Sequence, residues 1–163
     1  MDDTTAQGLR ALLQDATVAA LATLHRGEPA VSMVPYALLP DGRWVIHVSR
    51  LATHTQDMQA HAGVGLLVTA APASAPTPLA LPRVSVQGQA RICPPEDAAY
   101  PAARAAYLAR LPDAQELFGF SDFALFLIEP IFLRYVAGFG RAYTVTAAQY
   151  AALWPAGAAG QPA

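Results

Sequence analysis

One stretch of the sequence joins an apolar strand directly to a polar helix start: Val45-Ile46-His47-Val48-Ser49-Arg50-Leu51-Ala52-Thr53-His54-Thr55-Gln56-Asp57. Thr53 and Gln56 have the spacing of a capping box, which predicts that the N–H groups of residues 54–56 point out of the helix start. Such a helix start attracts anions because its free N–H groups carry partial positive charge. Residues 49–55 are therefore a candidate phosphate site, whose contacts would be Ser49, Arg50, Thr53, His54 and Thr55. The alternative interpretation is an ordinary capped helix with a solvated arginine.

The segments on either side have the apolar patterns of short antiparallel strands joined by turns. We expect strands over residues 18–24, 30–38, 43–48, 64–69, 83–92, 122–127 and 132–137. Glu129-Pro130 predicts a bulge or sharp bend between the last two. About six antiparallel strands hide their edges best by closing into a barrel. The predicted fold class is mainly β with inserted helices (α+β), built on a six-stranded antiparallel β-barrel.

Helical segments interrupt this strand order. The spacing of Leu9, Leu12 and Leu13 predicts a first helix, and we expect further helical segments over 51–61, 94–110 and from 112. Residues 71–82 are rich in proline and alanine, which predicts a surface loop. We expect one domain over residues 1–145, followed by a short C-terminal helix and a disordered tail over 146–163.

The composition indicates a folded domain with part of its surface covered. Hydrophobic residues make up 54% of the 163 residues and charged residues only 13%. So few charges favour a symmetric partner, and we expect a homodimer. The net charge of −2 argues against a nucleic-acid binder, which needs a clustered basic face. The chain has no lysine, so any phosphate must be met by arginine, histidine, hydroxyl or backbone N–H groups.

No segment has the pattern of a secretory signal or a membrane-spanning helix. The first residues, Met1-Asp2-Asp3-Thr4, are acidic, and the apolar run 123–128 lies between Asp122 and Glu129. A single cysteine, Cys93, excludes an intramolecular disulfide framework and a zinc site made of several cysteines. We therefore expect a cytoplasmic protein that neither enters a membrane nor holds a metal.

An ordered series of motifs extends beyond the strand-to-helix junction. Ser-Arg-Leu-Ala-Thr-His-Thr (49–55) is followed by Leu-Ala-Leu-Pro-Arg-Val-Ser-Val-Gln-Gly (79–88), Phe-Ser-Asp-Phe (120–123) and Gly-Phe-Gly-Arg-Ala (138–142). This order resembles the pyridoxamine-phosphate-oxidase-like FMN-binding split barrels, and within them the branch that contains the haem-utilisation proteins. The resemblance extends from about Gln14 to Tyr143 and implies a six-stranded split β-barrel of the FMN-binding type.

The resemblance implies that two copies form a homodimer with FMN at the subunit interface and the flavin phosphate at residues 49–55. The resemblance also implies that a strand segment lies along the isoalloxazine ring, made of Ser32, Met33, Val34 and Pro35. Arg83 and Gln87 are implied contacts from a neighbouring strand. Phe139 and Arg141 are implied to cover the ring from the partner subunit.

The chain departs from the oxidases at residues that bear on function. The oxidases place a lysine at the phosphate junction, so here Arg50 or His54 must substitute. The arginine and histidine set that the oxidases use for pyridoxamine phosphate is also missing, so that reaction is not implied. Some haem-utilisation proteins take their haem ligand from a histidine in an added C-terminal segment, whereas the last histidine here is His61. His25 and His47 are more simply read as structural residues.

Three functions are consistent with these residues. The first is FMN-dependent oxidoreduction of a small-molecule substrate, in which the flavin carries the electrons and no catalytic side chain is identified. The second is haem binding or haem utilisation. The third is a flavin-binding module without catalysis.

Overall fold

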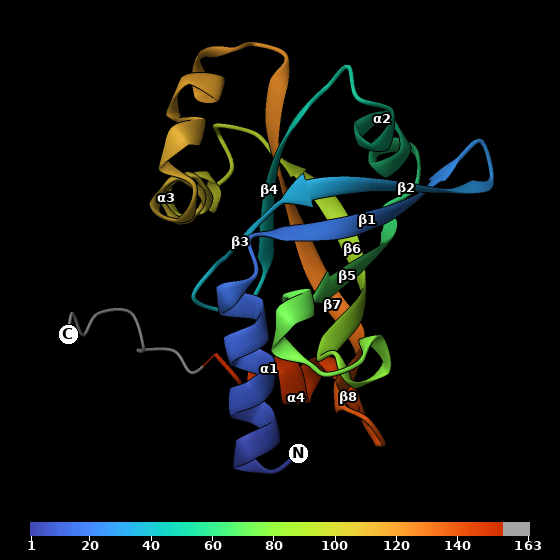
Figure 1. Ribbon diagram of the computed structural model, residues 1–163. Helices are drawn as coiled ribbons and strands as arrows, with labels where there is room; N and C mark the ends of the chain where they lie inside the picture. The colour runs from blue at the N-terminus through green and yellow to red at the C-terminus, as the bar shows by residue number, and fades with distance from the viewer. Residues whose placement is uncertain (155–163) are drawn as a thin grey trace.

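An antiparallel sheet with helices packed around it forms the fold, which a computed structural model describes over residues 1–154 (Figure 1). The strands are β1 (Val18–His25), β2 (Glu28–Pro35), β3 (Ala37–Leu38), β4 (Trp44–Ser49), β5 (Gly63–Thr69), β6 (Arg83–Cys93), β7 (Phe123–Gly138) and β8 (Arg141–Thr146). The α-helices are α1 (Asp3–Asp15), α2 (Thr53–Ala60), α3 (Tyr100–Arg110) and α4 (Ala147–Ala151), and the 3₁₀-helices are η1 (Pro72–Ser74), η2 (Pro78–Ala80) and η3 (Pro112–Gly119).

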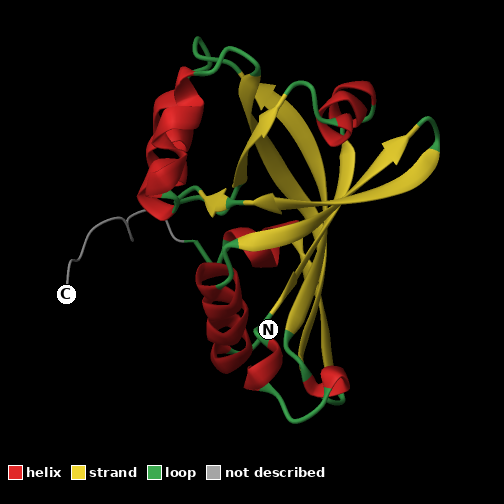
Figure 2. Cartoon of the chain, turned by 45° about the horizontal axis from the view of Figure 1, so that its top comes forward, coloured by secondary structure: helices red, strands yellow, loops and turns green. Residues whose placement is uncertain are grey.

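Strand β7 pairs with three other strands and so connects the two parts of the sheet. One edge of β7 pairs with β6, while the other pairs with β4 through residues 123–128 and with β8 through residues 132–138. The full order is β2-β1-β5-β6-β7-β4-β3, with β8 beside β7. Only Tyr36 separates β2 from β3 in the chain, although they lie at opposite ends of this order. The sheet is therefore curled, as Figure 2 shows.

The main core lies inside the curl, and α1, α2 and α4 pack against it. Tyr36 and Trp44 are fully buried there with ring centroids 4.4 Å apart, and the Tyr36 hydroxyl donates a hydrogen bond to the Leu13 carbonyl. A second cluster lies under α3, where Ala103 and Tyr107 pack on Val45, Leu125 and Leu127. Strand β4 is consequently covered on both faces, which is why its sequence is almost continuously apolar.

The expected fold class is confirmed, although the strands divide differently. The predicted strand over 30–38 is two strands, because the chain leaves β1 at Tyr36 and joins β4. The two strands predicted over 122–127 and 132–137 are one. The expected bulge beside Pro130 bends β7 without ending it, and Ile131 is the residue left out of the register opposite Gln87 and Gly88.

Strand β8 is absent from the prediction, which gives seven strand segments and a barrel of about six strands. With β8 included, the sheet has eight strands. In the structure Gly138 and Gly140 have φ values of 148° and 73°, which only glycine adopts readily, and the chain turns there into a hairpin.

The remaining segments follow the prediction in outline. Residues 71–82 form an exposed connection with two single-turn 3₁₀-helices, and the predicted terminal helix is α4. The predicted tail lies outside the described residues from 155 onward, and the domain boundary at 145 stays a prediction. Within residues 1–154, no helix is both long and apolar enough to cross a membrane.

Candidate functional site

The junction between β4 and α2 is held together by Ser49, whose hydroxyl and carbonyl both have partners. The Ser49 hydroxyl donates to Asp122 Oδ2 at 2.9 Å and accepts from the Leu51 N–H. The Ser49 carbonyl accepts from the Thr55 hydroxyl at 2.7 Å. The Arg50 N–H donates to the Asp122 carbonyl at 2.6 Å. These bonds fix the loop against the residue that precedes β7.

The predicted capping box at Thr53 is wrong. The N-cap is Ala52, which has no side-chain oxygen, and Thr53 is the first helical residue. The Thr55 hydroxyl is fully buried on the Ser49 carbonyl, so it shapes the loop rather than lining an open surface. The first helical residues, Thr53 and His54, have N–H groups without an intrahelical acceptor, as every α-helix start does.

The Arg50 side chain and His47 border a cavity of about 210 Å³ beside the junction. Arg50 is exposed and forms no ion pair with any residue between 1 and 154. His47 is 7% exposed, stacks on Phe118 with ring centroids 3.9 Å apart, and meets Tyr107 edge-on. Burial lowers the pKa of His47 to about 4, so the ring is neutral near pH 7.

A buried carboxylate anchors α2 to β1. Asp57 is 5% exposed; its Oδ1 lies 2.8 Å from His25 Nδ1, and its Oδ2 accepts from the Thr23 hydroxyl at 2.9 Å. Burial alone would raise the pKa of Asp57, but the hydrogen bonds from His25 and Thr23 hold it below its usual value. Burial also lowers the pKa of His54, one turn earlier on the same helix. The sequence carried no signal for this cluster, because its members are 32 and 34 residues apart.

The residues expected along the flavin ring divide between the two faces of the sheet. Met33 pairs with Ala20, which also pairs with Leu67, so their side chains share the outer face. A second row of cross-strand partners lies beside them on the same face and consists of Val31, Ala22, Gly65, Gln87 and Phe132. Arg83 is the cross-strand partner of Thr69. Ser32 and Val34 alternate with Met33 and point inward; Val34 is buried, whereas Pro35 is partly exposed at the end of β2.

Phe139 and Arg141 lie at the turn between β7 and β8. Phe139 is 78% exposed, and Arg141 donates to the Ala137 carbonyl. β8 and α2 lie at opposite ends of the molecule (Figure 1), so within one chain this turn is remote from the junction. The structure therefore brings together the residues of 49–55, and separately Met33, Arg83 and Gln87 on the outer face.

The fold and the ordered motifs agree with a known family. A family model described as pyridoxamine 5'-phosphate oxidase matches residues 6–137. The chain belongs to this family of split-barrel proteins.

Among its relatives is the non-canonical heme oxygenase HOZ of the Arabidopsis thaliana chloroplast, 38% identical over 119 residues that cover 73% of this chain and 35% of HOZ. The structure of a heme binding protein from Mycobacterium smegmatis is similar, with a TM-score of 0.83 and 33% identity over 93% of this chain and 62% of that one. A fad-binding protein from Mesorhizobium loti shares the fold at a TM-score of 0.63 and 16% identity, over 82% and 92% of the two chains. The chain thus spans about a third of HOZ and less than two thirds of the mycobacterial protein.

Proposed function

We propose that this chain binds haem as the split-barrel unit of a haem-handling protein. The proposal rests on the two hydroxyl groups of the junction, which donate their hydrogen bonds to the protein itself rather than to a ligand. Ser49 donates to Asp122, and Thr55 donates to the Ser49 carbonyl. A flavin phosphate at this junction would meet a carboxylate where it needs donors. Two relatives named for haem, each more than 30% identical to this chain, support the haem alternative.

His25 fits the ligand that a haem iron requires. Iron binds the unprotonated nitrogen of a neutral imidazole, and a carboxylate on the other nitrogen commonly fixes the ring. In the neutral tautomer whose Nδ1–H donates to Asp57, the lone pair lies on Nε2, and the His25 side chain is 42% exposed against 6% for Asp57. His25 would therefore hold the iron, while Asp57 and Thr23 keep the ring in place. Bound haem would supply the iron for oxygen or electron chemistry.

The outer face of the sheet favours a homodimer as the form that binds the cofactor. Val31 is 72% exposed and Met33 is 65% exposed, and the register places them beside Leu67 and Ala20. Apolar side chains exposed together in this way mark an interaction surface. A second copy of the chain is the partner we propose, because the same face on both copies makes a self-complementary contact.

Haem titration of the full chain tests the proposal. We expect saturable binding with a Soret band distinct from that of free haemin, and a shifted band with weaker binding in His25→Ala. Asp57→Asn should weaken binding without abolishing it, whereas His61→Ala, an exposed histidine just beyond α2, should match the parent. Absence of saturable haem binding by the parent would overturn the function. An unchanged band in His25→Ala would overturn only the ligand assignment.

Arg50 favours FMN as the second candidate cofactor. Its side chain is exposed without an ion pair in the described chain, and it precedes the start of α2, whose first N–H groups have no intrahelical acceptor. Quenching of FMN fluorescence measures binding, and Arg50→Ala should weaken it by about tenfold, the worth of one charge-assisted hydrogen bond. If FMN binds, oxidation of a reduced nicotinamide distinguishes a flavin-dependent oxidoreductase from a non-catalytic flavin module.

A further inference from the structure

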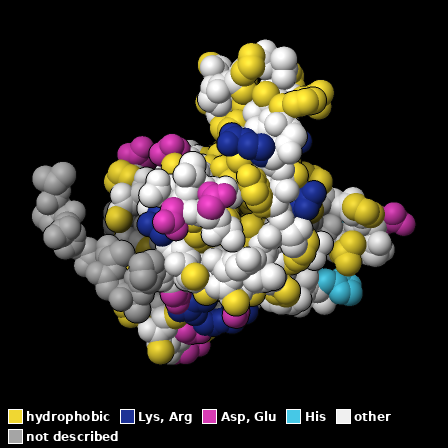
Figure 3. All heavy atoms as spheres, turned by 90° about the horizontal axis from the view of Figure 1, so that it is seen from below, with side chains coloured by type: hydrophobic (Ala, Val, Ile, Leu, Met, Phe, Trp, Pro, Cys, Tyr) yellow, Lys and Arg dark blue, Asp and Glu magenta, His cyan; other side chains and the backbone are white. Residues whose placement is uncertain are grey.

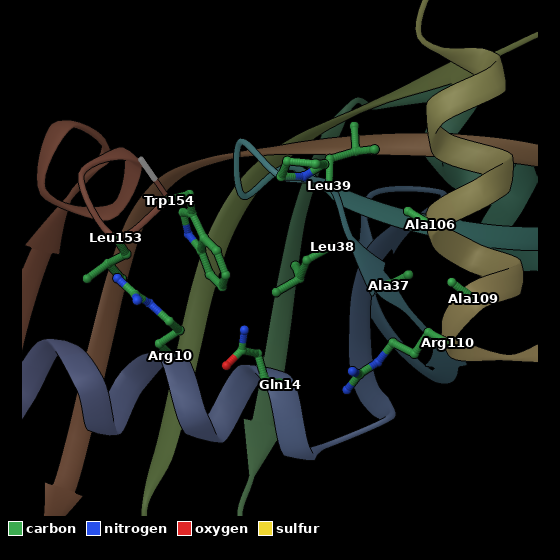
Figure 4. Close-up of a pocket in the computed structure, with 11 residues that line it drawn as sticks. Arg10, Gln14, Ala37, Leu38, Leu39, Ala106, Ala109, Arg110, Leu153 and Trp154 are labelled. Atoms are coloured by element: carbon green, nitrogen blue, oxygen red, sulfur yellow. The ribbon is translucent and has the colours of Figure 1, made fainter. Parts of the chain in front are cut away.

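A cavity of about 500 Å³ lies between α1 and α3 (Figure 4). Figure 1 shows both helices apart from α2 and the junction at its start. Arg10 and Gln14 come from α1, Arg110 from the end of α3, and Trp154 from the segment after α4. Figure 4 shows the Trp154 ring and the Gln14 amide extending toward each other, with Leu38 beside them. The volume is that of a small-molecule site.

The wall of this cavity has a surplus of hydrogen-bond donors. Six buried side-chain polar atoms have no partner within residues 1–154, and two of them, Arg10 Nε and Arg110 Nε, are on arginines that line this cavity. A third, Trp154 Nε1, is on a residue of the cavity wall but lies against Gly42, outside the lining. All three are N–H donors. Buried donors left unpaired are costly, so a ligand that brings acceptor oxygens would be stabilised here.

Neither arginine has a countercharge among the residues that the structure describes. Among residues 1–154 the ion pairs are His25 with Asp57, Arg43 with Asp41, and Arg91 with Asp97, none of which involves Arg10 or Arg110. None of the described residues that line the cavity is an aspartate or a glutamate. Two positive charges in one half-buried site therefore favour an anion.

Contacts within the protein use only some of the binding groups of Arg10 and Arg110. Arg110 Nη2 donates to the Ala16 carbonyl at the end of α1, and its guanidinium lies 5.5 Å from the Tyr36 ring centroid. The Arg10 guanidinium lies 5.9 Å from the Trp154 ring centroid. Stacking uses the flat face of a guanidinium and leaves the N–H groups at its edge free to bind.

The rest of the wall is apolar, which restricts the anion to one with an apolar body. Ala37, Leu38, Ala106 and Ala109 line the cavity together with Leu153. We propose that this cavity binds a small carboxylate with an apolar tail. Arg10 and Arg110 lie at the two ends of the cavity (Figure 4) and attract the anion electrostatically, and the tail packs on the alanine and leucine side chains. The site is independent of the proposed haem or flavin function, because it shares no residue with the junction or the outer face.

Calorimetric titration of the full chain with octanoate, and with the isosteric but neutral octanamide, tests the proposal. We expect saturable octanoate binding that is at least about tenfold tighter than octanamide binding, because only octanoate pairs with the arginines. Arg10→Gln and Arg110→Gln should each weaken octanoate binding by about tenfold and leave octanamide binding unchanged.

Ala109→Phe, which fills the cavity, should abolish binding of both compounds. Arg110→Gln also removes the hydrogen bond from Arg110 to the Ala16 carbonyl at the end of α1 and so can unfold the protein. In that case Arg10→Gln still tests the proposal. Equal affinity for octanoate and octanamide, no saturable octanoate binding by the parent, or unchanged octanoate binding in Arg10→Gln would overturn the proposal.

Discussion

Ser49 Oγ donates to Asp122 Oδ2 across 2.9 Å, although the two residues are 73 positions apart in the chain. The bond ties the loop after β4 to the residue that precedes β7, next to the first pair of the β4–β7 ladder. It thereby places a carboxylate where an anion-binding junction would offer only donors. The affinity of the junction for an anion therefore depends on the Ser49–Asp122 pair as much as on Arg50.

Asp122→Asn is expected to strengthen FMN binding by roughly two- to fivefold. The amide can still accept from Ser49, so the loop keeps its shape, while the negative charge that opposes a phosphate is removed. The effect is modest because Asp122 is partly exposed and solvent screens its charge. Fluorescence titration at two salt concentrations measures it, and the gain should shrink at high salt. Equal or weaker FMN binding by Asp122→Asn would show that this carboxylate does not face the phosphate.

The buried His47 should make the protein less stable as the pH falls from 6.5 to 4. The ordinary histidine pKa of 6.5 applies in the unfolded chain, whereas burial lowers the pKa in the folded chain to about 4. Between these values the unfolded chain binds more protons, so this stabilisation is complete above pH 6.5 and is lost below pH 4. A difference of this size corresponds to about 3 kcal/mol.

His47→Phe keeps an aromatic ring against Phe118 and removes the titrating group. Denaturant unfolding at pH 7 and pH 4.5 should therefore show a smaller loss of stability in His47→Phe than in the parent. The same pH dependence in both proteins would contradict the assignment to His47.

Gly88 lies where β6 passes the bulge in β7, and we expect Gly88→Ala to destabilise the fold by about 2 kcal/mol. A Cβ at this position would lie 2.7 Å from Ile128 Cγ2 and 2.9 Å from the Glu129 carbonyl, and Ile128 is fully buried. Gly63→Ala is the matched control, since its Cβ would meet only the flexible end of Gln89 at 3.9 Å. Thermal unfolding compares the two; similar melting temperatures would mean that β6 can shift to make room.

The sequence patterns that predicted the fold are local ones. The alternation in β6 and the apolar run of β4 mark those strands because each side chain's burial depends on its own strand face. The sequence spacing predicts the wrong N-cap because the helix begins one residue earlier than a Thr53 cap requires: Thr53 is already helical, and the N–H groups of Thr55 and Gln56 donate to the Ala52 carbonyl. Asp57 could not be predicted as a buried anchor, because its partners belong to a strand more than 30 residues earlier. Long-range polar pairs leave no periodic trace in a sequence.

Met33→Glu should dissociate the proposed homodimer. Met33 is 65% exposed on the outer face and lies in register with Ala20 and Leu67, so a second copy would bury it near the centre of the contact. Burying an unpaired carboxylate there is costly, and we expect the dimer dissociation constant to rise by more than tenfold. Sedimentation velocity separates the 17.1 kDa chain from its dimer. Gln56→Glu, on the exposed side of α2, adds the same charge away from this face and should leave the dimer intact. A parent that sediments as a monomer, or a Met33→Glu variant that remains dimeric, would exclude this face as the interface.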